Sequence, residues 1–417
     1  MKFSKLSQLL FVSCIGLTAA GFLTACQIVT ADYVFVAASA GSGGASSGVI
    51  DVFSADSESG ALRTAVSAAS SGGSLPVSMA VSSNYQNLYV ANQGSNNIVH
   101  FSIAYRGELT KKDAVTLGGE GSSPVAIAVN SAGTRLYVIS ANYPKNVPGA
   151  ALAAFSLGTD GTIGSPVPNG SADFWALTVP GYPNDLIVPT GIAVTANNDA
   201  VIVTAYDQSA YNPGGTATST ANPGWVFSFT AGSGGGLSPA AGSPFEAGVK
   251  PTGVVADPTT RFAYVTDFAS NELIGYSIHS GYALSFLVNG PFKTGNEPQA
   301  LTIDPRGKYI YVANALDSSV SAYAIDLGTG TPSAAVNVTG SSTNTTDTQP
   351  VAILVDPALG RFVYTANYLG DSVSGFRLNP NTGTLAPTQS GPYPSSAAPT
   401  ALASVPHGNH SVETVSP

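Results

Sequence analysis

The segment from Glu297 to Asp326 alternates short apolar runs with tight polar turns. Its sequence, EPQALTIDPRGKYIYVANALDSSVSAYAID, holds one short apolar run and two runs that alternate aliphatic or aromatic residues with smaller ones. Asp-Pro-Arg-Gly separates the first two runs, and a segment from Asn314 to Ser318 separates the last two. Two-residue alternation bounded by Pro, Gly, Asp and Asn predicts short antiparallel strands joined by tight turns.

This pattern recurs along the chain. Further copies start at Pro76, Pro251 and Pro350, and each contains a second strand similar to Tyr-Val-Ala-Asn. Strand-opening prolines number seven: Pro76, Pro124, Pro189, Pro251, Pro298, Pro350 and Pro399. Second strands also number seven: Tyr33–Ala37, Leu88–Ala91, Leu136–Ile139, Val201–Ala205, Ala263–Thr266, Ile310–Ala313 and Val363–Ala366. The chain is therefore predicted to be a repeat protein.

The two sets are offset, because Tyr33–Ala37 has no proline strand before it and Pro399–Val405 has no second strand after it. Units of ~50 residues with about four strands each are typical of propeller blades. We therefore predict an all-β, seven-bladed β-propeller over residues 32–406, in which the C-terminal strand completes the N-terminal blade. Such closure removes open sheet edges. An open solenoid is the alternative, but it leaves the two partial repeats unexplained.

The first 25 residues have the pattern of an export signal. Lys2 and Lys5 precede an apolar run that ends in Leu-Thr-Ala-Cys, which resembles a bacterial lipobox. We predict a lipoprotein signal peptide over residues 1–25, a lipidated Cys26, and a short tether over residues 26–31. The predicted location is the bacterial cell envelope, at the outer membrane or cell surface. An ordinary secretory signal with an incidental cysteine is the alternative. Residues 407–417 are predicted to form a tail.

The net charge limits the classes of molecule that the chain is expected to bind. The formal net charge is −9 and only 9% of residues are charged, so the chain lacks the basic surface that nucleic acid or anionic lipid requires. Membrane attachment is therefore expected through lipid alone. Hydrophobic residues make up 44% of the chain and follow strand periodicity, which argues against disorder. We expect a monomer without a cofactor.

Long connections are predicted to gather on one face. With strands A to D running from axis to rim, residues 142–149 and 207–224 lie in B–C loops. Residues 168–188 and 339–349 lie in D–A connections. B–C and D–A connections share one side of a propeller, here named the B–C/D–A face. Binding sites concentrate on long loops held by a rigid scaffold, so this face around blades three and four is the predicted working face.

Tyr-Val-Ala-Asn and Tyr-Val-Thr-Asp strands that follow Asp-Pro turns resemble the YVTN repeats of lactonase-family propellers. The resemblance covers nearly all of the chain after the signal. It implies a seven-bladed propeller and a possible relationship to propeller-type 6-phosphogluconolactonases. Those enzymes carry a Gly-Pro-Arg-His…Phe-His-Pro pattern. At the best match the chain has Thr252 for the Arg, Gly253 for the first His and Asp257 for the second.

Two groups of residues are candidates for ligand binding on the B–C/D–A face. The first contains the polar residues at or just after the ends of the B strands: Asn92, Asn142, Asp207, Asp267, Asn314 and Asn367. They could ring the channel mouth for sugar hydroxyls or Ca²⁺, or each could cap its own turn. The second contains the aromatic residues Trp175, Tyr206 and Tyr211, with Trp225 nearby. These could stack on a ligand or pack the loops.

Histidines offer little chemistry. His100 and His279 are predicted near the rim, and His407 and His410 near the C-terminus form either a metal pair or part of an exposed tail. No group in the sequence has metal-ligand spacing, and no Gly-x-Ser-x-Gly motif occurs. Two functions follow. The first is a membrane-anchored binding or scaffolding module for a glycan, peptide or protein. The alternative is a lactone hydrolase, although Thr252, Gly253 and Asp257 supply neither the base nor the cation that lactone opening needs.

Overall fold

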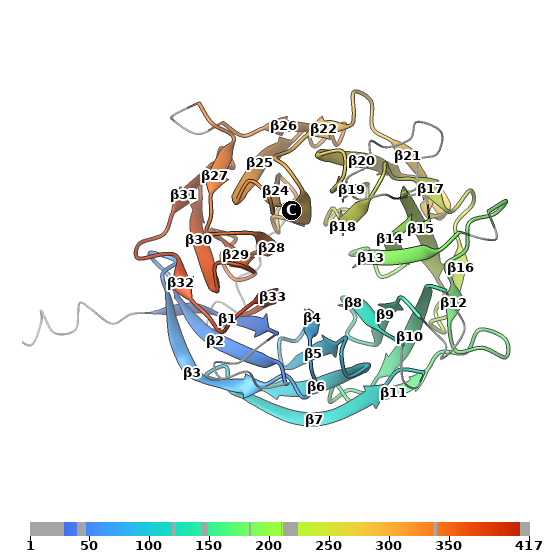
Figure 1. The fold of residues 1–417 in the computed structure, drawn as a ribbon, viewed down its shortest axis with the longest axis horizontal. Coiled ribbons are helices and arrows are strands. Elements are labelled where there is room, and N and C mark those ends of the chain that lie inside the picture. The colour runs from blue at the N-terminus through green and yellow to red at the C-terminus, as the bar shows by residue number, and fades with distance from the viewer. Residues whose placement is uncertain are drawn as a thin grey trace, which may run out of the picture.

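The computed structural model describes residues 29–39, 47–118, 122–142, 149–182, 185–209, 211, 224–336 and 340–408. Cys26 and His410 lie outside these ranges. Seven antiparallel sheets stand around a common axis, each running from an inner strand to the rim (Figure 1). The predicted seven-bladed β-propeller is confirmed. Among the described residues, the only helical element is the single 3-10 turn η1 (Ser280–Tyr282), and no helix is long and apolar enough to cross a bilayer.

Strands A and B of each blade supply the inner wall and the blade centre. The A strands, starting with blade one, are β33 (Pro399–Pro406), β4 (Pro76–Val81), β8 (Pro124–Val129), β13 (Ile187–Val194), β18 (Pro251–Ala256), β23 (Pro298–Ile303) and β28 (Pro350–Val355). The B strands are β1 (Thr30–Ala38), β5 (Asn87–Asn92), β9 (Arg135–Ser140), β14 (Ala200–Asp207), β19 (Phe262–Asp267), β24 (Tyr309–Asn314) and β29 (Phe362–Asn367).

Strands C and D complete each blade toward the rim. The C strands are β2 (Val49–Asp56), β6 (Asn97–Ile103), β10 (Ala151–Leu157), β15 (Gly224–Ala231), β20 (Glu272–Ile278), β25 (Ser319–Ile325) and β30 (Ser372–Leu378). The D strands are β3 (Leu62–Ser70), β7 (Leu109–Thr116), β11 (Ile163–Pro166), β16 (Leu237–Pro239), β21 (Leu284–Phe286), β26 (Pro332–Ala334) and β31 (Leu385–Pro387).

Outer strands of blades three to seven differ from the prediction. In each of these blades a second short piece pairs with the same C strand: β12 (Trp175–Ala176), β17 (Phe245–Glu246), β22 (Phe292–Lys293), β27 (Thr343–Thr345) and β32 (Tyr393–Pro394). The predicted D–A loops at 168–188 and 339–349 therefore contain part of the outer sheet. The predicted B–C loops at 142–149 and 207–224 fall between β9 and β10 and between β14 and β15, and most of their residues lie outside the described ranges.

The ring closes through strands from opposite ends of the chain. β33 pairs antiparallel with β1, which places Val405 opposite Tyr33 and Leu402 opposite Val36. Val405 is buried, and Leu402 packs against the apolar cluster between blades seven and one. The predicted completion of blade one by the C-terminal strand is therefore confirmed.

Tyrosines of the B strands link neighbouring blades. The Tyr89 hydroxyl donates to the carbonyl of Gly161 in blade three at 2.6 Å, and Tyr311 donates to Gly383 in blade seven at 2.9 Å. The Tyr364 hydroxyl donates to Gly60 in blade one at 2.8 Å. Apolar clusters from adjacent blades surround these tyrosines, so each interface combines burial with one directed bond. The Tyr of the repeat therefore builds the ring.

Candidate functional site

A pocket of about 500 Å³ lies on the propeller axis. In all seven A strands the second to fourth residues, counted from the strand-opening proline, line it, and Tyr368, just beyond β29, lines its end at the B–C/D–A face. In six blades the pairing of A with B shifts around the second of these positions, a bulge that occurs at Val77, Val125, Thr190, Gln299, Val351 and Thr400. In blade five the shift spans Thr252 and Gly253. A bulge re-aims the side chain that it carries. The repeat therefore presents its second residue to the pocket.

Threonines at this second position hold the ring together. Thr190 Oγ1 donates to the carbonyl of Pro251 at 2.8 Å, and Thr252 Oγ1 donates to Pro298 at 2.8 Å. Thr400 Oγ1 donates to Pro76 at 2.6 Å. Each bond runs from one blade to the first residue of the next. These hydroxyl protons are committed to the scaffold, so the threonine oxygens can face the pocket only as acceptors. Ser78 and Gln299 add further polar surface between the aliphatic residues of the wall.

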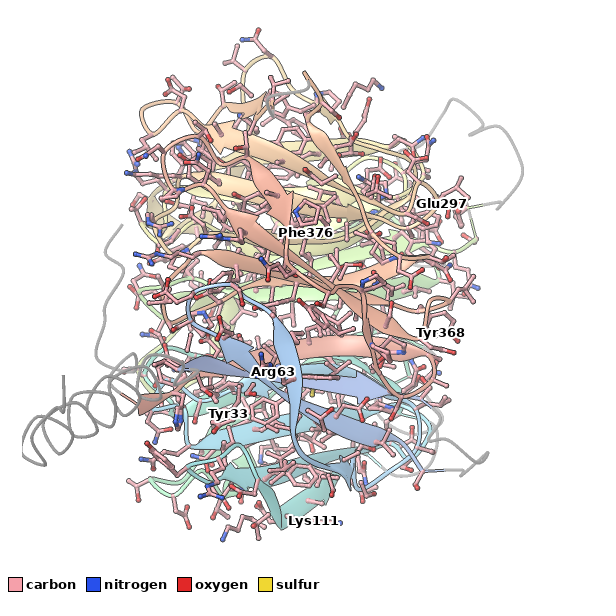
Figure 2. All side chains as sticks on the ribbon, turned by 90° about the vertical axis from the view of Figure 1, so that its left-hand side faces the viewer. Tyr33, Arg63, Lys111, Glu297, Tyr368 and Phe376 are labelled. Carbon is pink, nitrogen blue, oxygen red and sulfur yellow. The ribbon has the colours of Figure 1, made fainter. Side chains whose placement is uncertain are left out.

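Charged and aromatic residues lie on the B–C/D–A face, near the end of this pocket. We name Tyr206, Tyr211, Lys250, Phe268, Glu297 and Tyr368 the axial mouth, and of these Tyr368 lines the pocket itself. Lys250 and Glu297 each precede an A-strand proline, and Phe268 and Tyr368 each follow a B strand. Backbone bonds tie these positions together: Phe268 N–H donates to the Lys250 carbonyl at 2.9 Å. Seen from the side, Glu297 and Tyr368 lie toward one face of the disc, and Tyr33 lies toward the other (Figure 2).

Lys250 is the most unusual group at the mouth. Its Nζ lies 4.3 Å from the centroid of the Phe268 ring, 4.9 Å from that of Tyr211 and 5.6 Å from that of Tyr206. Partial burial lowers the pKa of Lys250, and the Glu297 carboxylate acts against this shift. Burial also raises the pKa of Tyr206 and Tyr211, so both phenols stay neutral near pH 7. The site therefore offers an ammonium within an aromatic nest.

Most of the predicted polar ring is buried. Asn92, Asp267, Asn314 and Asn367 are fully inaccessible, and Asp207 is nearly so. Asp267 accepts the N–H groups of Val249 and Lys250 at 2.8 and 2.9 Å, and Asn367 Nδ2 donates to two serines of β30. These contacts fit the capping alternative, in which each side chain holds the turns of its own blade. Asn142 alone among the six is exposed.

The predicted aromatic residues divide into two sets. Trp175 is buried in the cluster between blades three and four, and Trp225 packs half-buried against that cluster. Their indole N–H groups are buried, and no described residue accepts a hydrogen bond from them. Tyr206 and Tyr211 instead meet edge to face at the mouth, with ring centroids 5.4 Å apart. The structure therefore brings only Tyr206 and Tyr211 together with Lys250.

The three family positions carry no catalytic group. Thr252 is the inter-blade link described above. A Cβ on Gly253 would lie 2.7 Å from Leu301 Cδ2 and 3.1 Å from Thr266 Oγ1, so no histidine fits there without movement. Asp257 lies at the opposite end of β18, where its carboxylate accepts the N–H groups of Arg261 and Phe262 at 2.6 and 2.7 Å. Each residue serves the fold.

Histidines and acidic groups also belong to the scaffold. His100 is buried near the rim between Asp113 Oδ1, at 2.5 Å from Nδ1, and Asn87 Oδ1, at 2.8 Å from Nε2. His407 packs edge to face against Tyr33 and at a tilt against Tyr105, on the face opposite the mouth. Within the described ranges, no three His, Cys, Asp or Glu side chains are grouped so that they could hold a metal ion.

Lys250, Phe268, Glu297 and Tyr368 were not among the predicted site residues. The repeat contained a usable signal for them, because they occupy the positions just before an A-strand proline and just after a B strand. Those positions meet at the axis on the B–C/D–A face in every blade. The residues of the mouth occupy variable positions of the repeat on this face. The sequence prediction instead selected the regular Asn and Asp positions.

Comparisons with known proteins agree with this architecture. The family model described as "Lactonase, 7-bladed beta-propeller" matches residues 2–120, 34–171 and 244–409. A periplasmic gluconolactonase from Pseudomonas aeruginosa has a similar structure, with 17% identity, a TM-score of 0.69, and coverage of 90% of this chain and 99% of that chain. No curated protein sequence matches the chain.

A candidate 6-phosphogluconolactonase from Bacteroides uniformis is similar at 18% identity and a TM-score of 0.68, covering 90% of this chain and 100% of that chain. Another from Bacteroides fragilis is 16% identical with a TM-score of 0.69, covering 90% of this chain and 98% of that chain. At these identities the structural likeness concerns the fold alone.

Proposed function

Because the chain belongs to the lactonase family of seven-bladed β-propellers, we propose that it uses the family's scaffold as a binding module whose ligand enters the axial mouth. The observation that carries this proposal is the axial pocket of about 500 Å³, which all seven A strands line together with Tyr368. Such a volume suits a small molecule or the end of a glycan or peptide. The wall offers both apolar contact and polar surface, the latter from residues such as Ser78 and Gln299.

Blocking the pocket tests this proposal. Val351 lines it from a bulge of β28, so Val351→Trp should fill the space while the blade stays paired. We expect the variant to lose binding of any ligand found in a panel of monosaccharides, short glycans, peptides and lactones, measured by calorimetry. Leu327→Trp is the matched control, because Leu327 is exposed in the C–D turn of blade six, on the other face. Unchanged binding by Val351→Trp would place the ligand elsewhere.

Hydrolysis of a lactone or related ester is a second candidate, favoured by one observation. Glu297 precedes the proline of β23 as Lys250 precedes that of β18 in the adjacent blade, so a potential base and a cation occupy equivalent positions of neighbouring blades. The Glu297 carboxylate also acts electrostatically on Lys250. Lactone opening needs a base for water and a positive group for the developing oxyanion. In an assay with aldonolactones, Glu297→Gln should then abolish turnover and leave binding intact.

A phosphorylated lactone is a poor fit for this mouth. Phosphate is usually held by several charge-assisted donors, and Lys293, another cation of this face, is already paired with Glu272 at 2.8 Å. We therefore expect no meaningful hydrolysis of 6-phosphogluconolactone. Turnover within the ordinary enzyme range of roughly 1–10³ per second would contradict this expectation.

The cell envelope is the proposed location. The export signal, Leu-Thr-Ala-Cys and the lack of a basic surface support a lipid-anchored protein outside the cytoplasm. The similar Pseudomonas aeruginosa protein is described as periplasmic, which agrees with export.

A further inference from the structure

Lys250 is an ammonium without a polar partner. Among the described residues it makes no hydrogen bond and no ion pair, and its contacts are the three aromatic rings of the nest. Glu297 acts on it electrostatically but forms no ion pair with it. An ammonium carries three N–H donors, and a partly buried one pays a desolvation cost that ring contacts only partly offset. Among the described residues, the mouth therefore offers the Lys250 ammonium no hydrogen-bond acceptor.

Lys293 shows how a lysine of the same face behaves when it has a structural role. Its side chain is mostly exposed and its Nζ lies 2.8 Å from Glu272 Oε1. Lys250 differs in both respects, because it is half-buried and pairs with no described residue. Simple snorkelling of a lysine stem across an apolar surface would leave the ammonium in water. The nest instead holds this one against three rings, and Lys250 lies two residues before Thr252, the first residue of β18 that lines the axial pocket.

We propose that Lys250 binds the carboxylate of a small hydroxylated acid, such as a sugar acid, whose body enters the axial pocket. This inference rests on the proposed binding function and names its ligand class. A carboxylate matches a single ammonium, whereas a phosphate normally requires several donors. Glu297, close enough to influence Lys250, would also repel a dianion more strongly than a monoanion. The rings of Tyr206, Tyr211 and Phe268 keep water from the contact and can flank a sugar ring.

Matched acid and neutral sugars test the ligand class. We expect D-galacturonate and D-glucuronate to bind the wild type at least tenfold more tightly than D-galactose and D-glucose, in calorimetry at low ionic strength. Lys250→Met should abolish this preference, and Lys250→Arg should keep part of it. Lys293→Met removes the same charge from the same face and should leave the preference unchanged.

The outcomes separate this inference from the function on which it rests. Equal binding of acids and neutral sugars, or a preference that survives Lys250→Met, overturns the carboxylate assignment. If Val351→Trp still blocks the neutral sugars, the axial binding function stands without it. If acids bind with the Lys250 dependence but Val351→Trp has no effect, the carboxylate contact stands and the axial pocket is wrong. A wild type that binds none of the acids also overturns the inference.

Discussion

Asp32 occupies a position where three other blades have a cation. It directly precedes Tyr33 of β1, as Arg261, Lys308 and Arg361 precede the corresponding aromatic residues of β19, β24 and β29. Asp32 is fully buried, and no described residue makes a hydrogen bond of normal geometry to either carboxyl oxygen. Burial and the nearby Asp356 carboxylate raise its pKa well above the ordinary value, and the Ala358 amide offsets only part of this.

This position predicts that stability falls as pH rises. Folding favours protonated Asp32, so no penalty exists below the ordinary pKa of 3.8. Above this pH the carboxyl group ionises in the unfolded chain but stays protonated in the folded chain. The free energy of unfolding therefore falls by up to ~1.4 kcal/mol per pH unit until the pH passes the raised pKa of Asp32. Asp32→Asn should therefore be more stable than the wild type at pH 7.5, with the difference shrinking toward pH 4. Urea unfolding at several pH values measures this.

The other titratable groups that face Asp32 do not reverse the predicted fall in stability with rising pH. Burial raises the pKa of Asp356 as well, and its four backbone N–H bonds act against this shift, so its own contribution has the same sign as that of Asp32. Tyr364 and Tyr85 have raised pKa values and stay neutral. Glu58→Gln removes a charge from an exposed residue of a nearby turn and serves as the control. A loss of stability in Asp32→Asn at every pH would show that the carboxylate is satisfied in solution.

The Tyr364 hydroxyl is expected to contribute measurably to the interface between blades seven and one. Tyr364→Phe keeps the ring but leaves the Gly60 carbonyl without its 2.8 Å bond, which should cost ~1–2 kcal/mol in the free energy of unfolding. Tyr137→Phe is the matched control. Tyr137 holds the same position in blade three, and its hydroxyl makes no hydrogen bond to any described residue. Equal losses in both variants would mean that the directed bond adds nothing.

At the scale of elements, the sequence predicts the A and B strands well and the outer strands poorly. Prolines open the A strands, and Tyr-Val-Ala-Asn marks B strands that are buried on both sides, so local pattern and tertiary position agree. Pieces such as Trp175–Ala176 contain two residues each. So short a strand has no periodicity, and only its pairing with a C strand defines it.

The candidate site divides in the same way. The Asn and Asp residues at the ends of the B strands were predicted as ligand-binding residues because they recur in the repeat. They recur because they have the same structural role in each blade, as the buried caps Asn314 and Asn367 show. Lys250 and Glu297 vary among blades, and their importance appears only when the ring brings them to one mouth. Sequence spacing fixes the face on which a residue lies, but it does not reveal which variable residues meet across blades.

The short strand β12 is held in place mainly by one side chain, that of Trp175. Strand β12 places it beside Leu152, in the cluster between blades three and four. Trp175→Ala should destabilise the protein by ~3 kcal/mol or more because it leaves a large cavity, without changing ligand binding at the mouth. Tyr211→Ala should weaken ligand binding at the mouth and leave stability nearly unchanged, since Tyr211 is partly exposed. Thermal melts paired with calorimetry would decide, and a Trp175→Ala variant with normal stability and weakened binding would contradict this division.

At the scale of the molecule, closure depends on one strand. Removing residues 397–417 deletes β33, exposes the edge of β1, and uncovers Val36 and Phe35. We expect a lower melting temperature and loss of a single cooperative transition in calorimetry. Removing residues 409–417 alone leaves β33 intact and is the control. An unchanged, cooperative melt after the larger deletion would show that blade one is stable without its inner strand.

The direction of β1 also sets how an anchored propeller would face the membrane. B strands run toward the B–C/D–A face, so Thr30 lies at the opposite face, on the side toward which Tyr33 lies in Figure 2. Thr30 is the fourth residue after Cys26, which limits the distance between them to at most ~14 Å. A lipid on Cys26 would therefore hold the opposite face near the bilayer and leave the axial mouth pointing away.

Single cysteines test this orientation, because Cys14 leaves with the predicted signal and Cys26 would carry the lipid. Leu369 is 64% exposed in a B–C turn, and Tyr105 is 75% exposed in a C–D turn. On lipid vesicles, a membrane-impermeant maleimide should label Leu369→Cys as fast as in the soluble protein and label Tyr105→Cys several-fold more slowly. Both should react fast when Cys26→Ser removes the anchor. Slowed labelling of Leu369→Cys instead would mean that the mouth faces the membrane, where a large soluble ligand could not reach Lys250.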